Sequence, residues 1–143
     1  MAWEAPVQAL PFTAAIDMSS SGSNETTGAG QYRCMRSSAA GFVRYQENST
    51  GTVIGVLQNA PVANEAASVV SYGVTKLWVT SSAAEISVGE TVGCSTDGRA
   101  TEVTVATQSL IGTALEPCTS GPLLISVLLA GPGQGGSTVN TYV

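Results

Sequence analysis

Histidine is absent from this chain of 143 residues. Its absence excludes Ser-His and Cys-His nucleophile pairs, His-Glu-x-x-His zinc sites and imidazole bases, on which most hydrolases depend. The ten acidic residues stand singly in turns and strands, so they do not suggest the carboxylate pair of a glycosidase. We therefore expect no enzyme, with no catalytic residues, no metal site and no cofactor.

Charge is also scarce. Charged residues make up 10% of the chain, against about 25% in an average soluble domain, whereas Ser and Thr together number 33. Hydroxyl and amide groups must therefore hydrate most of the surface. With five basic residues and a net charge of −5, the chain lacks the basic stripe that neutralises phosphates. We expect no nucleic-acid partner.

Long apolar runs are missing. The longest, Leu123–Ala130, is interrupted by Ser126 and falls well short of the roughly 20 residues that a membrane-spanning helix needs. The first residues include an acid and a proline, and they lack the basic and apolar segments of a signal peptide. We expect no membrane partner and synthesis in the cytoplasm.

The three cysteines, Cys34, Cys94 and Cys118, are an odd number without Cys-x-x-Cys spacing. We interpret them as buried thiols that act as small hydrophobic residues. One alternative is a small enzyme with Cys94 as its nucleophile. Only Arg99 lies near enough in the sequence to lower the pKa of that thiol, so this alternative has little support.

Composition divides the chain into three parts. Residues 1–30 combine an apolar beginning with a Ser/Gly/Thr-rich stretch, which predicts an arm and a flexible linker. Residues 31–130 form the predicted body, and residues 131–143 a Gly-rich tail. Gly131–Gly136 fits the G-x-G-x-x-G dinucleotide motif, but too few residues follow it to supply the helix and second strand of that site.

Within the body, apolar and polar residues alternate with a period of two, and no sustained helical stripe occurs. The sequence predicts an all-β fold, a small β-barrel or β-sandwich of short antiparallel strands with an extended N-terminal arm. Leu123–Leu129 is apolar on both faces and should lie centrally. The expected strands are Gln31–Arg36, Gly41–Gln46, Thr52–Leu57, Ala67–Tyr72, Val74–Thr80, Thr91–Cys94, Thr101–Ala106, Ser109–Leu115 and Pro122–Ala130.

Asp97-Gly98 stands between two of these strands and predicts a tight hairpin, because both residues tolerate positive φ angles. A weak internal repeat supports the same organisation, with chance as the alternative. If the repeat is real, the body consists of two similar β units closed on each other. A shift of 57 residues aligns Gly41 with Gly98, Thr50 with Thr107 and Ile54-Gly55 with Ile111-Gly112, and a three-residue gap also aligns Cys34 with Cys94.

Lys76 and Trp78 share one face of the expected strand Val74–Thr80, opposite Leu77 and Val79. A tryptophan on the same face as a lysine suggests either a contact between subunits or a second face covered within the chain. The sequence does not decide between these two alternatives.

Three stretches read VIGVLQNAPVANEAASVVSYGVTKLWVT, ISVGETVGCSTDGRATEV and SLIGTALEPCTSGPLLISVLL. In this order they resemble the bacteriophage head decoration, or capsid cement, proteins, over about residues 50 to 130. The shared elements are an Ile-Gly-Val strand, an Asn-Glu turn, Val-rich strands, Gly-Glu and Asp-Gly turns, an Ile-Gly strand and a final Val/Leu strand. The first thirty residues depart from the family pattern in length and serine content.

The resemblance implies a virion protein on the outer surface of the assembled head, commonly a homotrimer, that clamps neighbouring major capsid proteins. We further expect Ala2–Ile16 to add a strand to a capsid sheet edge. Deleting residues 2–16 should then abolish binding and leave the body folded. The candidate capsid or subunit contacts are Trp3, Val7, Leu10, Phe12, Lys76 and Trp78.

A carbohydrate-binding β module displayed on a surface is the alternative function. Such modules bind sugars on aromatic platforms. Only eight aromatic residues occur here, without a cluster beyond Phe42 and Tyr45.

Overall fold

The computed structural model describes residues 5–19, 30–80, 85–105, 107–119 and 123–130. Within these ranges the chain is all-β, as predicted, and it contains no helix long and apolar enough to cross a bilayer. The strands are β1 (Ala5–Ala14), β2 (Cys34–Ala39), β3 (Phe42–Tyr45), β4 (Gly55–Leu57), β5 (Ala66–Trp78), β6 (Thr91–Cys94), β7 (Ala100–Glu102), β8 (Leu110–Ala114) and β9 (Leu124–Ala130).

The first five strands close into a small barrel. In the sheet, β1, β3, β2, β4 and β5 are neighbours in that order, and β1 also pairs with β5 along most of its length. A short parallel pairing of Ala14 with Val43 completes the ring. Closure pairs strand edges that would otherwise be open to association with other chains.

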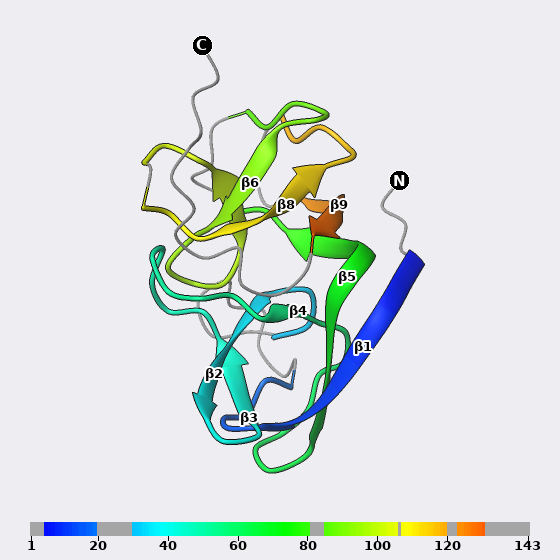
Figure 1. Cartoon of the computed structure of the whole chain (residues 1–143), viewed down its shortest axis with the longest axis vertical. Helices are drawn as coiled ribbons and strands as arrows, with labels where there is room; N and C mark the ends of the chain where they lie inside the picture. The colour runs from blue at the N-terminus through cyan, green and yellow to red at the C-terminus, as the bar shows by residue number, and fades with distance from the viewer. Residues whose placement is uncertain (1–4, 20–29, 81–84, 106, 120–122, 131–143) are drawn as a thin grey trace.

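The remaining strands form a second barrel on the other side of β5. The sheet continues from β5 through β9, β8 and β6 to β7. Val79, directly after β5, makes a parallel bridge to Ala100 in β7, and Thr80 N donates to Ala100 O at 2.9 Å. Figure 1 shows β2 to β4 in the lower half of the molecule and β6, β8 and β9 in the upper half, with β5 running between them.

The two barrels are repeats of one unit, so the predicted repeat is confirmed. Each unit closes on itself, however, and the two share β5. From β2, β3 and β4 to β6, β7 and β8 the strand pairing follows a shift of 57 residues, which takes Met35 to Val92, and from β5 to β9 the shift is 58. Corresponding pairs are Met35–Tyr45 with Val92–Glu102, Arg36–Arg44 with Gly93–Thr101, Ser37–Val43 with Cys94–Ala100, Met35–Gly55 with Val92–Gly112, and Cys34–Val56 with Thr91–Thr113.

Turns and loops follow the same shift. The hairpin glycines Gly41 and Gly98 have φ angles of 77° and 78°. The bond from Tyr32 N to Leu57 O at 2.7 Å has its counterpart in the bond from Gly89 N to Ala114 O at 2.8 Å. Because the shift needs no gap, Cys34 corresponds to Thr91 and Cys94 to Ser37. The gapped alignment of Cys34 with Cys94 was therefore wrong.

A single strand, β5, replaces the two that the sequence predicted on either side of Gly73. Gly73 lies opposite Pro6 in β1 and Leu129 in β9, so the ladder passes through it from one barrel to the other. Its φ of 102° is open to glycine and strained for other residues. The glycine therefore redirects the strand without ending it.

Corresponding positions also form the two cores. The first core contains Ala14, Met35, Val43, Leu57, Ala67 and Val69. Their counterparts Val79, Val92, Ala100, Ala114, Ile125 and Val127 are all buried in the second core. In one core pair the alanine and the valine are exchanged. Ala14 lies opposite Val43 in the first barrel, whereas at the corresponding positions of the second barrel Val79 lies opposite Ala100.

Two further differences from the sequence prediction concern single strands. The expected strand Thr101–Ala106 ends at Glu102, because the Gln108 side chain donates to Glu102 O at 3.2 Å and accepts from Thr104 N at 3.1 Å. The last strand is central as predicted, between β5 and β8. Its outer face is not fully covered, since Leu128 is 45% exposed.

Candidate interaction surfaces

The N-terminal segment is a barrel strand, which corrects the prediction of an arm outside the body. Leu10 lies opposite Val69 in the β1–β5 ladder, and Phe12 packs against the core of the first barrel. Ala14 is fully buried. The body therefore begins no later than residue 5. Trp3 and the side chain of Val7 lie outside the described part of the chain.

The outer edge of β1 has no strand partner over most of its described length. Beyond Thr13 and Ala14, which pair with β3, the described residues of β1 have strand partners only in β5. Pro6 and Pro11 interrupt this edge, and proline is a common means of blocking strand addition because it lacks an N–H. A shallow depression of about 230 Å³ lies across the β1–β5 ladder and is lined by Ala9, Leu10, Pro11, Asn59, Ala66, Ala67 and Ser68.

Lys76 and Trp78 lie at the junction of the two barrels. The Lys76 ammonium stands 5.6 Å from the centre of the Tyr32 ring, a cation–π distance. Trp78 N donates to Tyr32 O at 3.0 Å. Lys76 thus has a contact within the chain, as one of the two alternatives predicted. A subunit contact by either residue stays a prediction.

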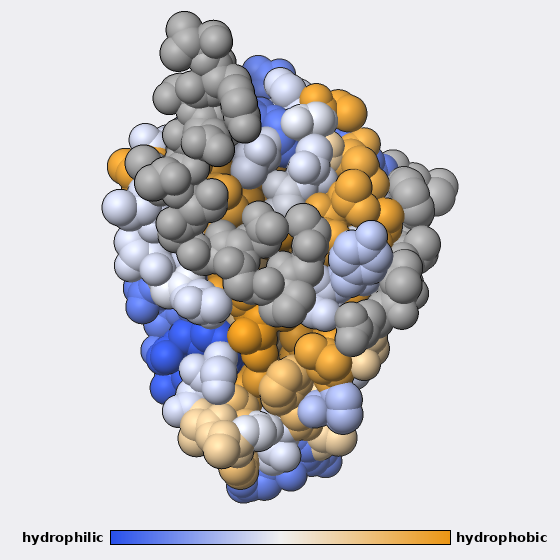
Figure 2. Space-filling view, viewed as in Figure 1, coloured by the Kyte–Doolittle hydropathy of each residue, from blue (hydrophilic) through white to orange (hydrophobic). Residues whose placement is uncertain are grey.

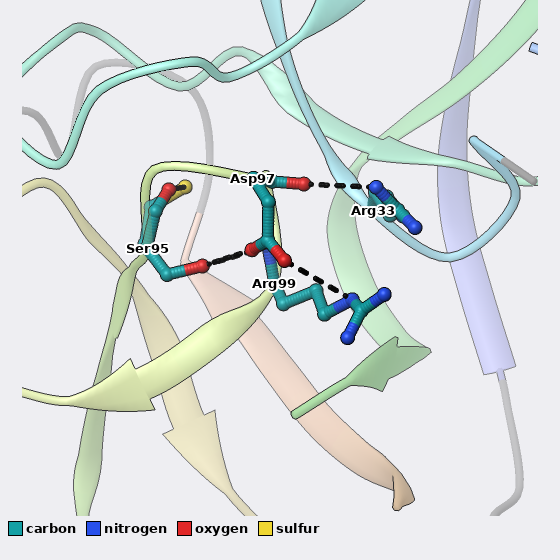
Figure 3. A network of polar contacts seen from close by, with 5 residues as sticks. Arg33, Ser95, Asp97 and Arg99 are labelled. Atoms are coloured by element: carbon teal, nitrogen blue, oxygen red, sulfur yellow. Dashed lines mark hydrogen bonds and ion pairs between the residues drawn. The ribbon is translucent and has the colours of Figure 1, made fainter. Parts of the chain in front are cut away.

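A polar network fixes the predicted Asp97-Gly98 turn to the first barrel (Figure 3). Arg33 donates to Asp97 O at 3.2 Å, while the Asp97 carboxylate accepts from Ser95 Oγ and lies 3.4 Å from Arg99 Nε. Burial lowers the pKa of Arg33, and repulsion by Arg99 lowers it further. Cys34 N also donates to Gly98 O at 2.7 Å. The turn therefore joins the barrels.

All three cysteines are buried free thiols, as predicted. Burial raises the pKa of Cys34 well above its ordinary value, and the contact with Cys94 raises it further. Cys94 is fully buried, so a substrate has no access to it. Among the described residues, no cluster of three or more Cys, Asp or Glu side chains could hold a metal ion.

The sequence reasoning missed a charged cluster on the β2–β3 hairpin. Arg36 and Arg44 lie directly opposite each other, and both make ion pairs with Glu47. Like charges in this position repel, so Glu47 stabilises the pair. Arginines four residues either side of Ala40 were the available signal. Their counterparts in the second barrel, Gly93 and Thr101, carry no charge.

Apolar side chains are exposed in several places. Figure 2 shows them on one face of the molecule, including the region where Figure 1 places β8, β9 and the adjoining part of β5. Tyr72 and Leu128 lie on the outer face of the second barrel. Leu128 lies opposite Val74, and Tyr72, two residues before Val74 on β5, lies on the same face as Val74. Among the described residues, the exposed large apolar ones are Val62, Tyr72, Val88, Val105, Leu123 and Leu128.

A family model described as phage cement protein matches residues 22–129, well over half of the chain. The chain belongs to the phage cement protein family. The predicted family resemblance is thereby confirmed, and the match includes both repeated units of this cement protein except β1. Membership implies a protein that binds the phage capsid and is located in the virion.

The fold of this cement protein is also found in a solved structure. The base of the head fiber protein gp8.5 of bacteriophage phi29 aligns with a TM-score of 0.56 and 13% identity, over 90% of this chain and 96% of that one. At this identity the likeness concerns the fold. No curated protein matches the sequence.

Proposed function

We propose that this chain binds the outer surface of the assembled phage head, where it contacts the major capsid protein and stabilises contacts between its neighbours. The observation that carries this proposal is membership of the cement family across both barrels. A closed, ion-poor double barrel suits the role, since a repeated shape contact on a symmetric shell needs no catalytic group. The protein is made in the host cytoplasm and acts on the virion as a homo-oligomer, with a trimer as the expected state.

The mode of attachment differs from the one expected from the sequence. β1 already pairs with β5, so it is not available as a free peptide for a capsid sheet edge. The depression beside β1 is the better candidate for the capsid contact. It contains Leu10, one of the predicted contact residues, and it is lined mainly by small apolar side chains. An apolar loop of the capsid protein fits this chemistry.

The test mixes purified protein with expanded heads that lack it. Co-sedimentation should saturate at a fixed ratio to the capsid protein, and bound heads should resist a higher temperature than bare heads. Binding to glycans without binding to heads would support the carbohydrate module instead and overturn the proposal.

A charged substitution tests the depression itself. Ala9 is exposed at its rim, so Ala9→Glu should leave the barrel folded and weaken head binding at least tenfold. Thr107→Glu adds the same charge at an exposed site outside the depression and should bind normally. Equal binding by both variants would exclude the depression while leaving head binding itself intact.

A further inference from the structure

The two barrels contact each other through the outer face of β2, β4 and β5, which we call the wall of the first barrel, and through the end of the second barrel that carries the β6–β7 turn. Cys34, Val56 and Val70 lie side by side on the outer face of β2, β4 and β5, and all three are buried. They belong to the same core cluster as the interior of the second barrel. The end of that barrel, which carries the Ser95–Arg99 turn, is therefore seated on the wall of the first.

Because the barrels are repeats, each half of this contact has a copy with exposed side chains. The copied wall is the outer face of β6, β8 and β9, where Thr91, Thr113 and Leu128 lie in the same register as Cys34, Val56 and Val70. Thr91 is exposed and Leu128 is 45% exposed. The row continues on β5 to Val74, beside Tyr72, which is 51% exposed.

The copied end is the tip of the β2–β3 hairpin, residues 37–41, which corresponds to Cys94–Gly98. These five residues read Ser-Ser-Ala-Ala-Gly, and all are exposed. Nothing lies within 4 Å of a Cβ placed on Gly41, whereas a Cβ on Gly98 would approach Cys34 O to 3.1 Å. A turn without charges or large side chains allows another backbone to approach closely. Gly41 O accepts from Thr13 N at 2.8 Å within the chain, but the side chains of the hairpin tip are exposed like those of a contact that its counterpart already makes.

We propose that a second copy of this chain docks head to tail, with its residues 37–41 on the Thr91–Thr113–Leu128 wall of the first. The contact repeats the one already made between the two barrels within each chain. Ser37 and Thr91 replace the buried cysteines of that contact, which suits a surface exposed to water before assembly. A head-to-tail contact uses two different patches, so it closes into a ring when the rotation allows.

Cysteine cross-linking of purified protein tests this geometry independently of any capsid. Cys94 and Cys34 contact each other within the chain, so Ser37 of one copy should contact Thr91 of the next. In the Ser37→Cys/Thr91→Cys double variant, glutathione disulfide should accept two electrons for each S–S bond formed and leave two reduced glutathiones. Covalent multimers should appear on non-reducing gels and disappear after reduction.

The single variants determine the direction of the contact. Each alone should remain uncross-linked, and an equimolar mixture of the two should give dimers and nothing larger, because each chain then carries one accessible thiol. Wild-type protein is the control, since its three thiols are buried. Dimers of one single variant would indicate a symmetric contact and overturn the proposal. Absence of cross-links in the double variant would do the same.

A variant without new cysteines provides an independent measurement. Leu128→Glu places a charge in the centre of the proposed wall and should weaken self-association at least tenfold in sedimentation experiments. Val105→Glu is the matched control, because Val105 is 52% exposed and lies in the loop after β7, outside both surfaces. Equal association of the two variants would contradict the proposed wall.

Discussion

The two barrels have one strand order and are closed in the same way, but they differ in what covers them. Each is closed by a short parallel pairing, Ala14 with Val43 in the first and Val79 with Ala100 in the second. The outer wall of the first barrel is buried under the second, whereas the outer wall of the second faces solvent. The comparison shows that backbone pairing defines this unit, whereas side chains adapt each copy to its surroundings.

Removing β1 should have the largest effect on this comparison. Deleting residues 2–14 opens the first barrel and removes Phe12 and Ala14 from its core. We expect loss of the cooperative unfolding transition, measured by circular dichroism during heating. The sequence alone predicted that the body would stay folded after deletion of residues 2–16, whereas the structure predicts that it would not. A deletion variant that melts at the wild-type temperature would show that β1 is dispensable.

Two corresponding glycines should be equally intolerant of a side chain. A Cβ on Gly55 would lie 2.3 Å from Val70 O, and one on Gly112 would lie 2.1 Å from Leu128 O. Alanine at either position must displace backbone, so we expect a loss of about 3 kcal/mol or more in the free energy of unfolding. Gly41→Ala is the control, with positive φ but open space, and should lose about 1 kcal/mol. Urea titration measures all three.

Exchanging one core pair should make the second barrel resemble the first. Val79→Ala should lose about 2 kcal/mol through a cavity, and Ala100→Val should lose about 1 to 3 kcal/mol through crowding. The double variant recreates the Ala14–Val43 arrangement and should recover at least about 1 kcal/mol relative to the sum of the single losses. Strictly additive losses, measured by urea titration, would show that the two sites are packed independently.

The smallest expected effect concerns pH and the buried wall of the first barrel. Burial and the Cys94 contact raise the pKa of Cys34, so the folded thiol stays protonated where the unfolded thiol, with a pKa of about 8.5, ionises. Stability is therefore fully present below this pH and falls toward the raised folded pKa by up to about 1.4 kcal/mol per pH unit. Cys34→Ala should show a shallower alkaline decline in urea titrations. An unchanged slope would assign the decline to other groups.

Some of this architecture could be predicted from local sequence. Gly98 marked its hairpin correctly, with a φ of 78°, although Asp97 does not share the positive φ that was expected of both residues. The period of two identified most strands. The sequence did not predict β1 as a strand of the body, because Pro6 and Pro11 interrupt the strand pattern, although an edge strand accommodates prolines. β5 was divided at Gly73 because glycine ends many strands, whereas here it bends one. In both cases partners distant in sequence determined the outcome.

The candidate surfaces were harder to predict for the same reason. Alternation placed Lys76 and Trp78 on one face, but whether that face meets Tyr32 or another subunit depends on how the barrels pack. The exposed turn at residues 37–41 has an unremarkable composition. Only the corresponding segment Cys94–Gly98, which contacts the other barrel, draws attention to it.

A strand that forms part of both barrels leaves no linker at which the chain could bend. The two barrels cannot move apart independently. β5 pairs with both β1 and β9, so displacing it from β9 would also strain its ladder with β1. A load applied at one end of the molecule is carried to the other through continuous backbone. The two barrels therefore transmit force as one stiff body.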